Sequence, residues 1–409
     1  MHADSLAEFC ERKIADTLDL LREMVAINSF TENASGVNRL GEFTAAAFAP
    51  LGFEASFHPA THPAHGRHLV LDRRAGSEAP TIALVSHLDT VFTEEEEQCN
   101  EFFWRREGSR IYGPGTNDIK GGTALIHLML GAFQAELPRI FEETNWMILL
   151  NACEEVISPD FRNLCRARLP ANTVACLIFE VDGGASDDFS LVAARKGRAT
   201  FSIEVEGRGA HAGSSHQNGA NAVLELADLV GRVGRMTDYD QNLTVNVGSL
   251  HGGTVANRVP HFAQAGLEMR AFSGEIFADA KRTILACAGP GSVCSADGTA
   301  HHCQVRATLD GETGPWPPNG ATNRLITLWQ QAGRELHLRV GSEKRGGLSD
   351  GNVLWDLFPT MDGLGPRGEN SHCSEQSPDG TKEQEWVDAS SFVPKAVLNA
   401  RGILKLLQK

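Results

Sequence analysis

The stretch TIALVSHLDT, residues 81–90, decides the fold of this chain. Its apolar run ends directly in His87 and Asp89. Two later stretches have the same pattern of an apolar run followed by acidic residues, NWMILLNACEEV at 145–156 and VACLIFEVD at 174–182. Runs that are apolar throughout predict strands buried on both faces of a sheet. Because leucine and isoleucine at helical spacing also predict helices over 5–27, 37–51 and about 121–136, we expect an α/β domain with a central mixed sheet and flanking helices.

The pattern of apolar and polar residues changes after Arg195. The segment ATFSIEVE at 199–206 alternates apolar and polar residues, and the order that follows is strand, helix, strand, strand, helix, strand. That order predicts an inserted ferredoxin-like α+β layer with one open sheet face. A chain of 409 residues also exceeds what one core usually fills. We therefore place one discontinuous domain at 1–195 and 313–409 and the insert at 196–312.

Composition excludes several classes of partner. The formal charge is −15, and no basic run is long enough to neutralise a row of phosphates, so nucleic acid is not expected. We see neither a secretory signal nor an apolar run that could span a bilayer. The nine cysteines are scattered without paired spacing, which is typical of reduced thiols. These features predict a cytoplasmic protein.

Acidic and histidine residues gather just beyond the carboxyl ends of the three predicted buried strands. Ligands of open α/β sheets collect in the crevice at those ends. His87 and Asp89 lie two residues apart, so an extended backbone points both side chains to one side, as suits a metal ligand and its supporting carboxylate. Adjacent Glu154 and Glu155 would be costly to bury without a cation nearby. One of them can bind a metal while the other acts as a general base.

Two further residues extend this pattern. Asp118 lies in the glycine-rich turn IYGPGTNDIKGG at 111–122, where a carboxylate can bridge two cations, although capping of the following helix is the ordinary alternative. His372 lies in a loop within FPTMDGLGPRGENSHCSE at 358–375 and could complete the shell of a second cation. A histidine-rich tract between His58 and His68 contains prolines and is expected to be an irregular surface segment.

The motifs HLDTV, GPGTNDIKGG, NACEEV and IFE, with the late His372, resemble the zinc aminoacylase and carboxypeptidase family in order and approximate spacing. That family includes acetylornithine deacetylase, succinyl-diaminopimelate desuccinylase and bacterial glutamate carboxypeptidase. The resemblance spans the whole chain and implies a catalytic domain of the zinc-peptidase type with an inserted dimerisation or lid domain.

The resemblance also implies a role for each matching residue. It assigns His87 and Glu180 to one zinc, Glu155 and His372 to a second, and Asp118 to both. Asp89 would orient His87, and Glu154 would be the general base. The segment FEVDGG at 179–184 lacks the frequent Glu-Pro of the family, which leaves Asp182 as an alternative to Glu180. Nitrogen and oxygen ligands suit zinc but also admit cobalt or manganese.

The same resemblance assigns residues of the insert and of one later loop to the substrate. His211 would stabilise the oxyanion in the active site of a partner subunit, which implies a homodimer. Asn257 and Arg270 would lie near the substrate carboxylate, since the planar arginine fork binds carboxylates bidentately. The loop GGLSDGN at 346–352 would place Gly347 and Ser349 near the ligand.

The sequence therefore predicts a di-zinc hydrolase that cleaves an amide bond next to a free carboxylate, in a small peptide or an N-acyl amino acid. We favour a carboxypeptidase or dipeptidase like glutamate carboxypeptidase. An N-acyl-amino-acid deacylase of the acetylornithine or succinyl-diaminopimelate type is the alternative, because both reactions need the same metal pair. A relative that has the fold without the chemistry would have lost a ligand or the base, and none is lost here.

Overall fold

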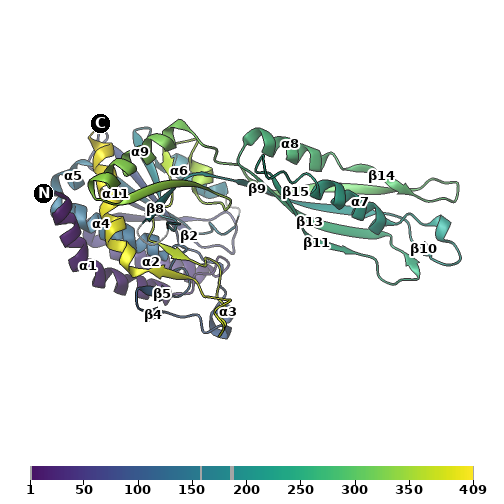
Figure 1. Cartoon of the computed structure of the whole chain (residues 1–409), viewed down its shortest axis with the longest axis horizontal. Helices are drawn as coiled ribbons and strands as arrows, with labels where there is room; N and C mark the ends of the chain where they lie inside the picture. Colours follow the sequence, from purple (N-terminus) through teal and green to yellow (C-terminus); the bar gives the residue numbers. More distant parts are fainter. Residues whose placement is uncertain (1, 157–158, 185–187, 409) are drawn as a thin grey trace. The chain divides into compact units, whose positions relative to one another are not determined.

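The computed structural model of the chain describes residues 2–156, 159–184 and 188–408. The chain forms two compact units (Figure 1). Unit 1 consists of Met1–Ala193, Pro318–Lys344 and Ser349–Lys409, and unit 2 consists of Ala194–Pro317 and Arg345–Leu348. The first unit is thus discontinuous in sequence.

The centre of unit 1 is a mixed sheet. Among the described residues, six strands form it in the order β1-β2-β6-β3-β7-β17. The first two pairings are antiparallel, and β6, β3, β7 and β17 run parallel. The strands are β1 (Glu54–Pro59), β2 (Arg67–Arg73), β3 (Thr81–His87), β6 (Asn145–Asn151), β7 (Thr173–Ile178) and β17 (Thr360–Met361). The three apolar stretches that predicted buried strands are β3, β6 and β7.

Alternate residues of these strands enter two different cores. Leu84, Ile148 and Leu177 belong to the large core that includes α1 (His2–Val25), α4 (Lys120–Glu136) and α11 (Phe392–Leu407). Val85 and Leu149, their neighbours, pack in a smaller core with residues of α6 (Pro159–Arg168) and α10 (Gly351–Leu354) on the other face. Because successive side chains of a strand point to opposite faces, a strand covered on both sides must be apolar at every position. This explains the continuous apolar runs of the sequence.

The helices of unit 1 flank this sheet and two smaller ones. Asn33 caps α2 by accepting the N–H of Gly36. The helices are α1 (His2–Val25), α2 (Ala34–Phe48), α3 (Glu94–Cys99), α4 (Lys120–Glu136), α5 (Pro138–Glu143), α6 (Pro159–Arg168), α9 (Gly320–Glu335), α10 (Gly351–Leu354) and α11 (Phe392–Leu407), with 3-10 turns at Ala49–Leu51 and Ala389–Ser391. The smaller sheets contain β4 (Arg105–Glu107), β5 (Arg110–Tyr112), β18 (Gly368–Glu369) and β19 (Trp386–Asp388), and the pair β8 (Asp188–Arg195) with β16 (Arg339–Arg345). In the part of the chain that is described, no helix combines the length and the apolar character that crossing a membrane requires.

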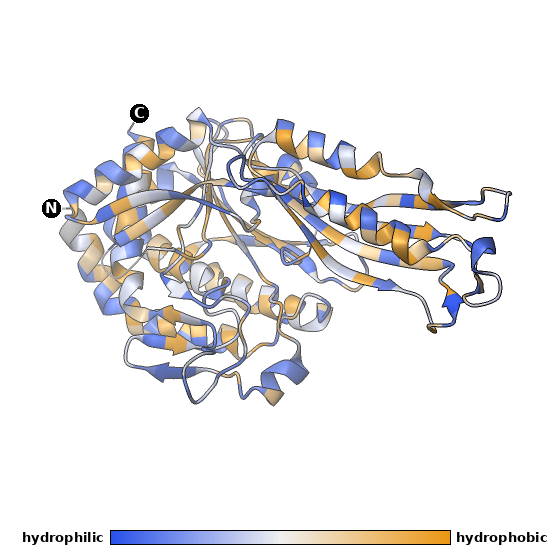
Figure 2. Cartoon of the chain, turned by 45° about the vertical axis from the view of Figure 1, so that its right-hand side comes forward, coloured by the Kyte–Doolittle hydropathy of each residue, from blue (hydrophilic) through white to orange (hydrophobic). Residues whose placement is uncertain are grey.

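Unit 2 is an antiparallel sheet with α7 (Ala222–Gly234) and α8 (Gly274–Leu285) packed on one face (Figure 1). Its described strands follow the order β11-β13-β9-β15-β14. They are β9 (Gly197–Glu206), β11 (Thr244–Gly252), β13 (Phe262–Ala271), β14 (Gly289–Cys294) and β15 (His302–Thr313). Inward-facing residues of β9 alternate with partly exposed ones, and the helices carry both orange hydrophobic and blue hydrophilic residues in Figure 2. The predicted α+β layer with helices on one face is confirmed.

Two features of unit 2 were not predicted. Strand β14 has the sequence GPGSVC, and glycine and proline are depleted in strands, so its pattern does not indicate one. A short ribbon also forms between β10 (Ala210–His211) and β12 (Arg258–Val259), in which His211 pairs with Arg258. Each of these strands has only two residues, too few for a periodic pattern.

Candidate metal centre

The carboxyl ends of β3, β6 and β7 meet at one edge of the sheet. His87, the last residue of β3, pairs in register with Asn151, the last residue of β6. Glu154 and Glu155 follow β6, and Glu180 follows β7. Parallel pairing brings the three strand ends side by side, as in other open α/β sheets whose ligands bind there.

The first group of ligand atoms comprises His87, Asp118 and Glu180, whose ligand atoms lie within 4.8 Å of one another. His87 Nε2 is 3.0 Å from Asp118 Oδ1 and 3.8 Å from Glu180 Oε1. His87 and Glu180 are buried. The turn that carries Asp118 can approach β7 closely because α4 begins with glycines: a Cβ at Gly122 would lie 2.1 Å from the carbonyl oxygen of Phe179.

The second group comprises Asp118, Glu155 and His372, again within 4.8 Å. His372 Nε2 is 3.4 Å from Asp118 Oδ2 and 3.2 Å from Glu155 Oε2. Asp118 belongs to both groups, with Oδ1 facing His87 and Oδ2 facing His372. It makes no cap of α4, whose N-cap position is occupied by Ile119 without a side-chain hydrogen bond. The capping alternative therefore does not describe this residue.

The imidazole of His87 is oriented by a contact at its other nitrogen. Nδ1 lies 2.9 Å from the backbone carbonyl of Asp89 and 3.4 Å from its carboxylate. A proton on Nδ1 therefore has an acceptor, which leaves Nε2 with a lone pair directed at Asp118 and Glu180. The carbonyl of Asp89, rather than its carboxylate, is the nearer partner.

The carboxylate of Asp89 makes its shortest contacts with the turn after β6. Its Oδ1 accepts the N–H of Glu154 at 3.0 Å, and its Oδ2 accepts the N–H of Glu155 at 3.2 Å. The hydroxyl of Thr31 also donates to Oδ2, at 2.7 Å. The side chain expected to orient a ligand thus also positions the backbone of both glutamates.

Several carboxyl groups here are costly to ionise in the absence of a cation. Burial is the main cause that raises the pKa of Glu154 well above its ordinary value; His87 opposes this, and Glu180 and Asp350 add to it. Burial, with Asp118 next, raises the pKa of Glu155 to about 7. A pKa raised toward neutrality suits a general base.

The residues present fit two small cations. Glu155 Oε1 is buried and has no hydrogen-bond partner among the described residues, which leaves a carboxylate oxygen available to a metal. The two groups offer imidazole nitrogens and carboxylate oxygens, the ligands that zinc accepts. A cation between the carboxylates would favour their ionised forms and so offset the burial and the repulsion that raise their pKa values.

Asp182, the alternative to Glu180, is occupied elsewhere. Its carboxylate pairs with the buried ammonium of Lys395 and accepts the backbone N–H groups of Gly184 and Ser190. Asp182 is fully buried and is absent from both ligand groups. The geometry therefore favours Glu180 as the ligand of the first cation.

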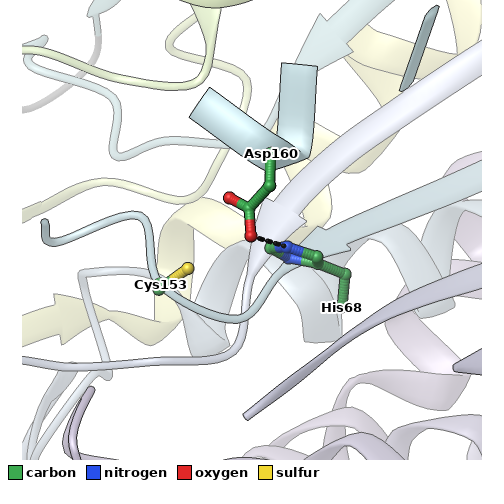
Figure 3. Close-up of side chains that lie close together, drawn as sticks. All are labelled: His68, Cys153 and Asp160. Atoms are coloured by element: carbon green, nitrogen blue, oxygen red, sulfur yellow. Dashed lines mark ion pairs between the residues drawn. The ribbon is translucent and has the colours of Figure 1, made fainter. Parts of the chain in front are cut away.

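A third cluster contains His68, Cys153 and Asp160 (Figure 3). His68 is buried in β2 rather than lying in an irregular surface segment, so that expectation was wrong for this residue. Its Nδ1 accepts the N–H of Ala152 at 3.1 Å, and its Nε2 faces Asp160 Oδ2 at 3.4 Å. The ring proton must then be on Nε2. Metal binding at Nε2 would leave the ring with no proton. This cluster is therefore better suited to supporting the turn after β6 than to binding a cation.

Within unit 2, His211 presents a hydrogen-bond donor. Its Nδ1 accepts the N–H groups of Gly213 and Ser214, each at 3.1 Å. The proton of the neutral ring is therefore on Nε2, which points away from these contacts. Asn257 lines the same open depression as His211, and its carbonyl accepts the N–H of Ala212.

The other predicted substrate residues have partners within their own units. Arg270 Nε and Nη2 lie 2.6 and 3.2 Å from the carboxylate of Glu268, and Nη1 donates to Gly346. The carbonyl of Gly347 accepts from Arg195. Ser349 is buried and donates to Asp362 at 2.8 Å. Arg270, Gly347 and Ser349 are thus held by the protein, and their roles at a substrate stay predictions.

Two buried carboxyl groups of the site were missed by the sequence analysis. Glu385 accepts the N–H of Asn117 at 3.0 Å and that of His372 at 3.4 Å, so it links the two loops that carry metal-ligand candidates. Asp350 accepts from Asn151 at 2.7 Å. Asp350 stands in the glycine-rich loop already singled out, which was a usable signal. Glu385 lies in the polar run TKEQEW at 381–386, whose sequence gives no signal of a functional site.

The chain is similar to known peptidases and to a deacetylase. Residues 193–291 match the family described as peptidase dimerisation domain. Carboxypeptidase G2 of Pseudomonas sp. (strain RS-16) is 26% identical over 389 residues, which cover 94% of this chain and 88% of that protein. An acetylornithine deacetylase of Klebsiella pneumoniae (strain 342) is 24% identical over 277 residues, 63% of this chain and 68% of that one.

The fold is likewise that of solved peptidases. An M20 family metallo-carboxypeptidase from Sulfolobus solfataricus superimposes with a TM-score of 0.66 at 14% identity, covering 96% of this chain and 99% of that one. The expected α/β fold and family resemblance are confirmed. The chain is therefore a hydrolytic enzyme related to the zinc aminoacylases and carboxypeptidases, with the fold of the M20 metallopeptidases and a peptidase dimerisation domain inserted in it.

Proposed function

We propose that this enzyme uses two divalent metal ions to hydrolyse an amide bond next to a free carboxylate, and that its substrates are small peptides. The observation that carries the proposal is the position of Asp118, one carboxylate shared by two groups of nitrogen and oxygen ligands, with Glu154 beside them.

The ligand groups assign the metal-binding residues. His87, Asp118 and Glu180 would hold one cation, and Asp118, Glu155 and His372 the other. Zinc suits these ligands, and cobalt or manganese could replace it. When bound, the cations act as Lewis acids that polarise the amide carbonyl and lower the pKa of a water molecule.

Glu154 is the proposed general base. Its carboxylate accepts a proton from the attacking water and then delivers that proton to the leaving amine nitrogen. Burial raises its pKa well above the ordinary value, which favours acceptance of a proton by this carboxylate. Asp89 positions this base by accepting the N–H groups of Glu154 and Glu155.

His211 is the proposed oxyanion donor. The tautomer set by Gly213 and Ser214 leaves Nε2–H free to donate to negative charge on the attacked oxygen. In a homodimer formed through the dimerisation domain, His211 of one subunit would serve the active site of the other. A symmetric dimer of this kind uses the same surface of both subunits.

Carboxypeptidase or dipeptidase activity is the first candidate because the similarity to carboxypeptidase G2 covers most of both chains. Deacylation of N-acyl amino acids is the second candidate, favoured by the similarity to an acetylornithine deacetylase. The two reactions share every residue named above, so substrate assays decide between them.

The experiment combines metal analysis with activity. We expect about two metal ions per folded chain, in line with the two ligand groups, and hydrolysis of dipeptides and N-acyl amino acids by the zinc- or cobalt-loaded enzyme. Glu154→Gln should abolish measurable turnover while retaining the metal. Glu78→Gln, an exposed control, should behave as the wild type. Full activity of Glu154→Gln, or a metal content near zero after zinc loading, would contradict the proposal.

A further inference from the structure

The turn after β6 is held by side chains at four consecutive backbone N–H groups. The donors and their acceptors are Ala152 N–H to His68 Nδ1 at 3.1 Å, Cys153 N–H to Asn151 Oδ1 at 3.1 Å, Glu154 N–H to Asp89 Oδ1 at 3.0 Å and Glu155 N–H to Asp89 Oδ2 at 3.2 Å. A backbone N–H that is buried without a partner costs free energy, so each acceptor restricts where the turn can lie. Together they fix the backbone that carries Glu154, the proposed general base.

His68 approaches this turn from β2. That strand is antiparallel to β6, and Leu69 pairs with Leu150. His68 comes one residue before Leu69 and therefore lies beside the carboxyl end of β6, where the turn begins. It is 1% exposed, and its ring packs against Phe161 of α6, with the ring centroids 5.4 Å apart. The imidazole is thus confined next to the N–H of Ala152.

The carboxylate of Asp160 determines which nitrogen of His68 is the acceptor. Burial is the main cause that lowers the pKa of His68, and Asp160 opposes it, so the ring is neutral at neutral pH and has one donor and one acceptor nitrogen. Asp160 Oδ2 faces Nε2 at 3.4 Å (Figure 3). Because a carboxylate can only accept, the ring proton lies on Nε2, and Nδ1 presents its lone pair to Ala152.

Asn151 shows the same arrangement at the next N–H group. Its amide also has a donor end and an acceptor end. Nδ2 donates to Asp350 Oδ1 at 2.7 Å, which leaves Oδ1 to accept the N–H of Cys153. At two adjacent positions, therefore, a carboxylate orients a side chain that could otherwise present either a donor or an acceptor. This repetition indicates that the turn requires fixed acceptors and not only close packing.

We propose that His68, oriented by Asp160, is a positioning residue for the general base. It holds the N–H of Ala152 and thereby keeps the carboxylate of Glu154 at the metal centre. This inference rests on the proposed function. What catalysis requires of His68 is the acceptor at Nδ1, rather than the bulk of the ring or the contact of Nε2 with Asp160.

Two amide variants separate the two nitrogens of His68. His68→Asn places an amide oxygen where Nδ1 was and removes the group at Nε2. His68→Gln can still donate to Asp160 but has no acceptor at the Nδ1 position. His68→Gln should lower kcat by roughly 10- to 100-fold, because displacement of a catalytic group by about 1 Å can cost 100-fold. His68→Asn should stay within about threefold of the wild type, because it retains the acceptor.

KM for a dipeptide and the metal content per folded chain should match the wild type in both variants, since neither removes a ligand. His62→Gln is the control. His62 is exposed, and its Nδ1 accepts the N–H of Ala64 at 3.3 Å, so this variant removes the same kind of bond outside the turn and should retain wild-type kcat. Equal kcat values for His68→Asn and His68→Gln, or a greater loss in His68→Asn, overturn the proposal, because packing or the contact with Asp160 would then account for the role.

Two measurements need no turnover. Hydrogen exchange of the zinc-loaded protein should be faster for the amides of residues 152–155 in His68→Gln than in His68→Asn. In ¹⁵N spectra of histidine-labelled wild type, the signals that disappear in His68→Asn should be those of an Nε2–H tautomer. If the wild type hydrolyses nothing, the proposed function fails, and these measurements still decide whether His68 holds the turn. Equal exchange in the two variants, or an Nδ1–H tautomer in the wild type, overturns the inference.

Discussion

Replacement of Asp89 by asparagine tests how the turn that carries the general base is held. The carboxylate is buried and accepts three hydrogen bonds, from the N–H groups of Glu154 and Glu155 and from the hydroxyl of Thr31. Asparagine preserves the shape but offers one acceptor oxygen. Because the three donors approach two different oxygens, an amide NH₂ must face at least one of them.

Either orientation of the amide costs one backbone hydrogen bond. With the NH₂ group at the Oδ2 position, the Thr31 hydroxyl can rotate to accept from it, and the N–H of Glu155 loses its acceptor. With the amide oxygen at the Oδ2 position, Glu155 and Thr31 keep their acceptor. The NH₂ group then opposes the N–H of Glu154, which loses a bond of 3.0 Å to a charged acceptor. A hydrogen bond to a charged group contributes about 1.5–3 kcal/mol, and a buried donor without a partner costs a similar amount. We expect a loss of about 3 kcal/mol in the free energy of unfolding and, because displacement of a catalytic group by about 1 Å can cost 100-fold in rate, a fall in kcat of that order.

The assay uses thermal and urea unfolding of the zinc-loaded protein together with kcat and KM for one dipeptide. Thr31→Val is the matched control, since it removes the hydroxyl donor but leaves both backbone N–H groups with their acceptor. It should cost about 1.5 kcal/mol or less and leave kcat within about threefold. If the two variants have the same kcat, Asp89 does not position Glu154 and the reasoning is refuted.

Other variants test the neighbouring contacts. Lys395→Met leaves Asp182 buried without its cation, so the free energy of unfolding should fall by about 3–5 kcal/mol in urea titrations, with no change in metal content per folded chain; a fall in metal content would show that this buried pair also supports the metal centre. Glu180→Gln should instead lower the metal content measured by elemental analysis, because Glu180 is a member of the first ligand group. His68→Leu removes the acceptor of the Ala152 N–H and should destabilise the protein by about 1–3 kcal/mol at wild-type metal content, whereas loss of one metal per chain would show that the third cluster binds a cation. Treatment with a chelator should lower the melting temperature of the wild type, and saturation with zinc at 100 times Kd should stabilise it by about 2.7 kcal/mol; an unchanged melt would argue against metal binding.

The sequence predicted the strands that carry the site better than it predicted which charged side chains pair with each other. Continuous apolar runs identified β3, β6 and β7, since a strand covered on both faces must be apolar at every position. Residues just beyond such strands meet at one edge of the sheet, so the strand pattern was enough to group His87 with Glu154, Glu155 and Glu180, while the family resemblance assigned Glu155 rather than Glu154 to a metal. These apolar runs are local features of the sequence, so each strand could be predicted without knowledge of its neighbours.

Which charged groups pair with each other could not be predicted in the same way. Arg270 resembled a carboxylate-binding residue, yet its guanidinium is engaged with Glu268. Glu385 supports Asn117 and His372 from a polar segment far along the chain.

By itself, the sequence determined the strand that ends in His87, the glutamates that follow two neighbouring strands, and hence the chemistry that the edge of the sheet can support. Only the tertiary structure decided that Glu180 faces the site while Asp182 pairs with Lys395. The physical reason is one of range. Apolar periodicity is imposed by the strand itself, whereas the state of a charged group depends on the partner that folding places within a few ångströms of it.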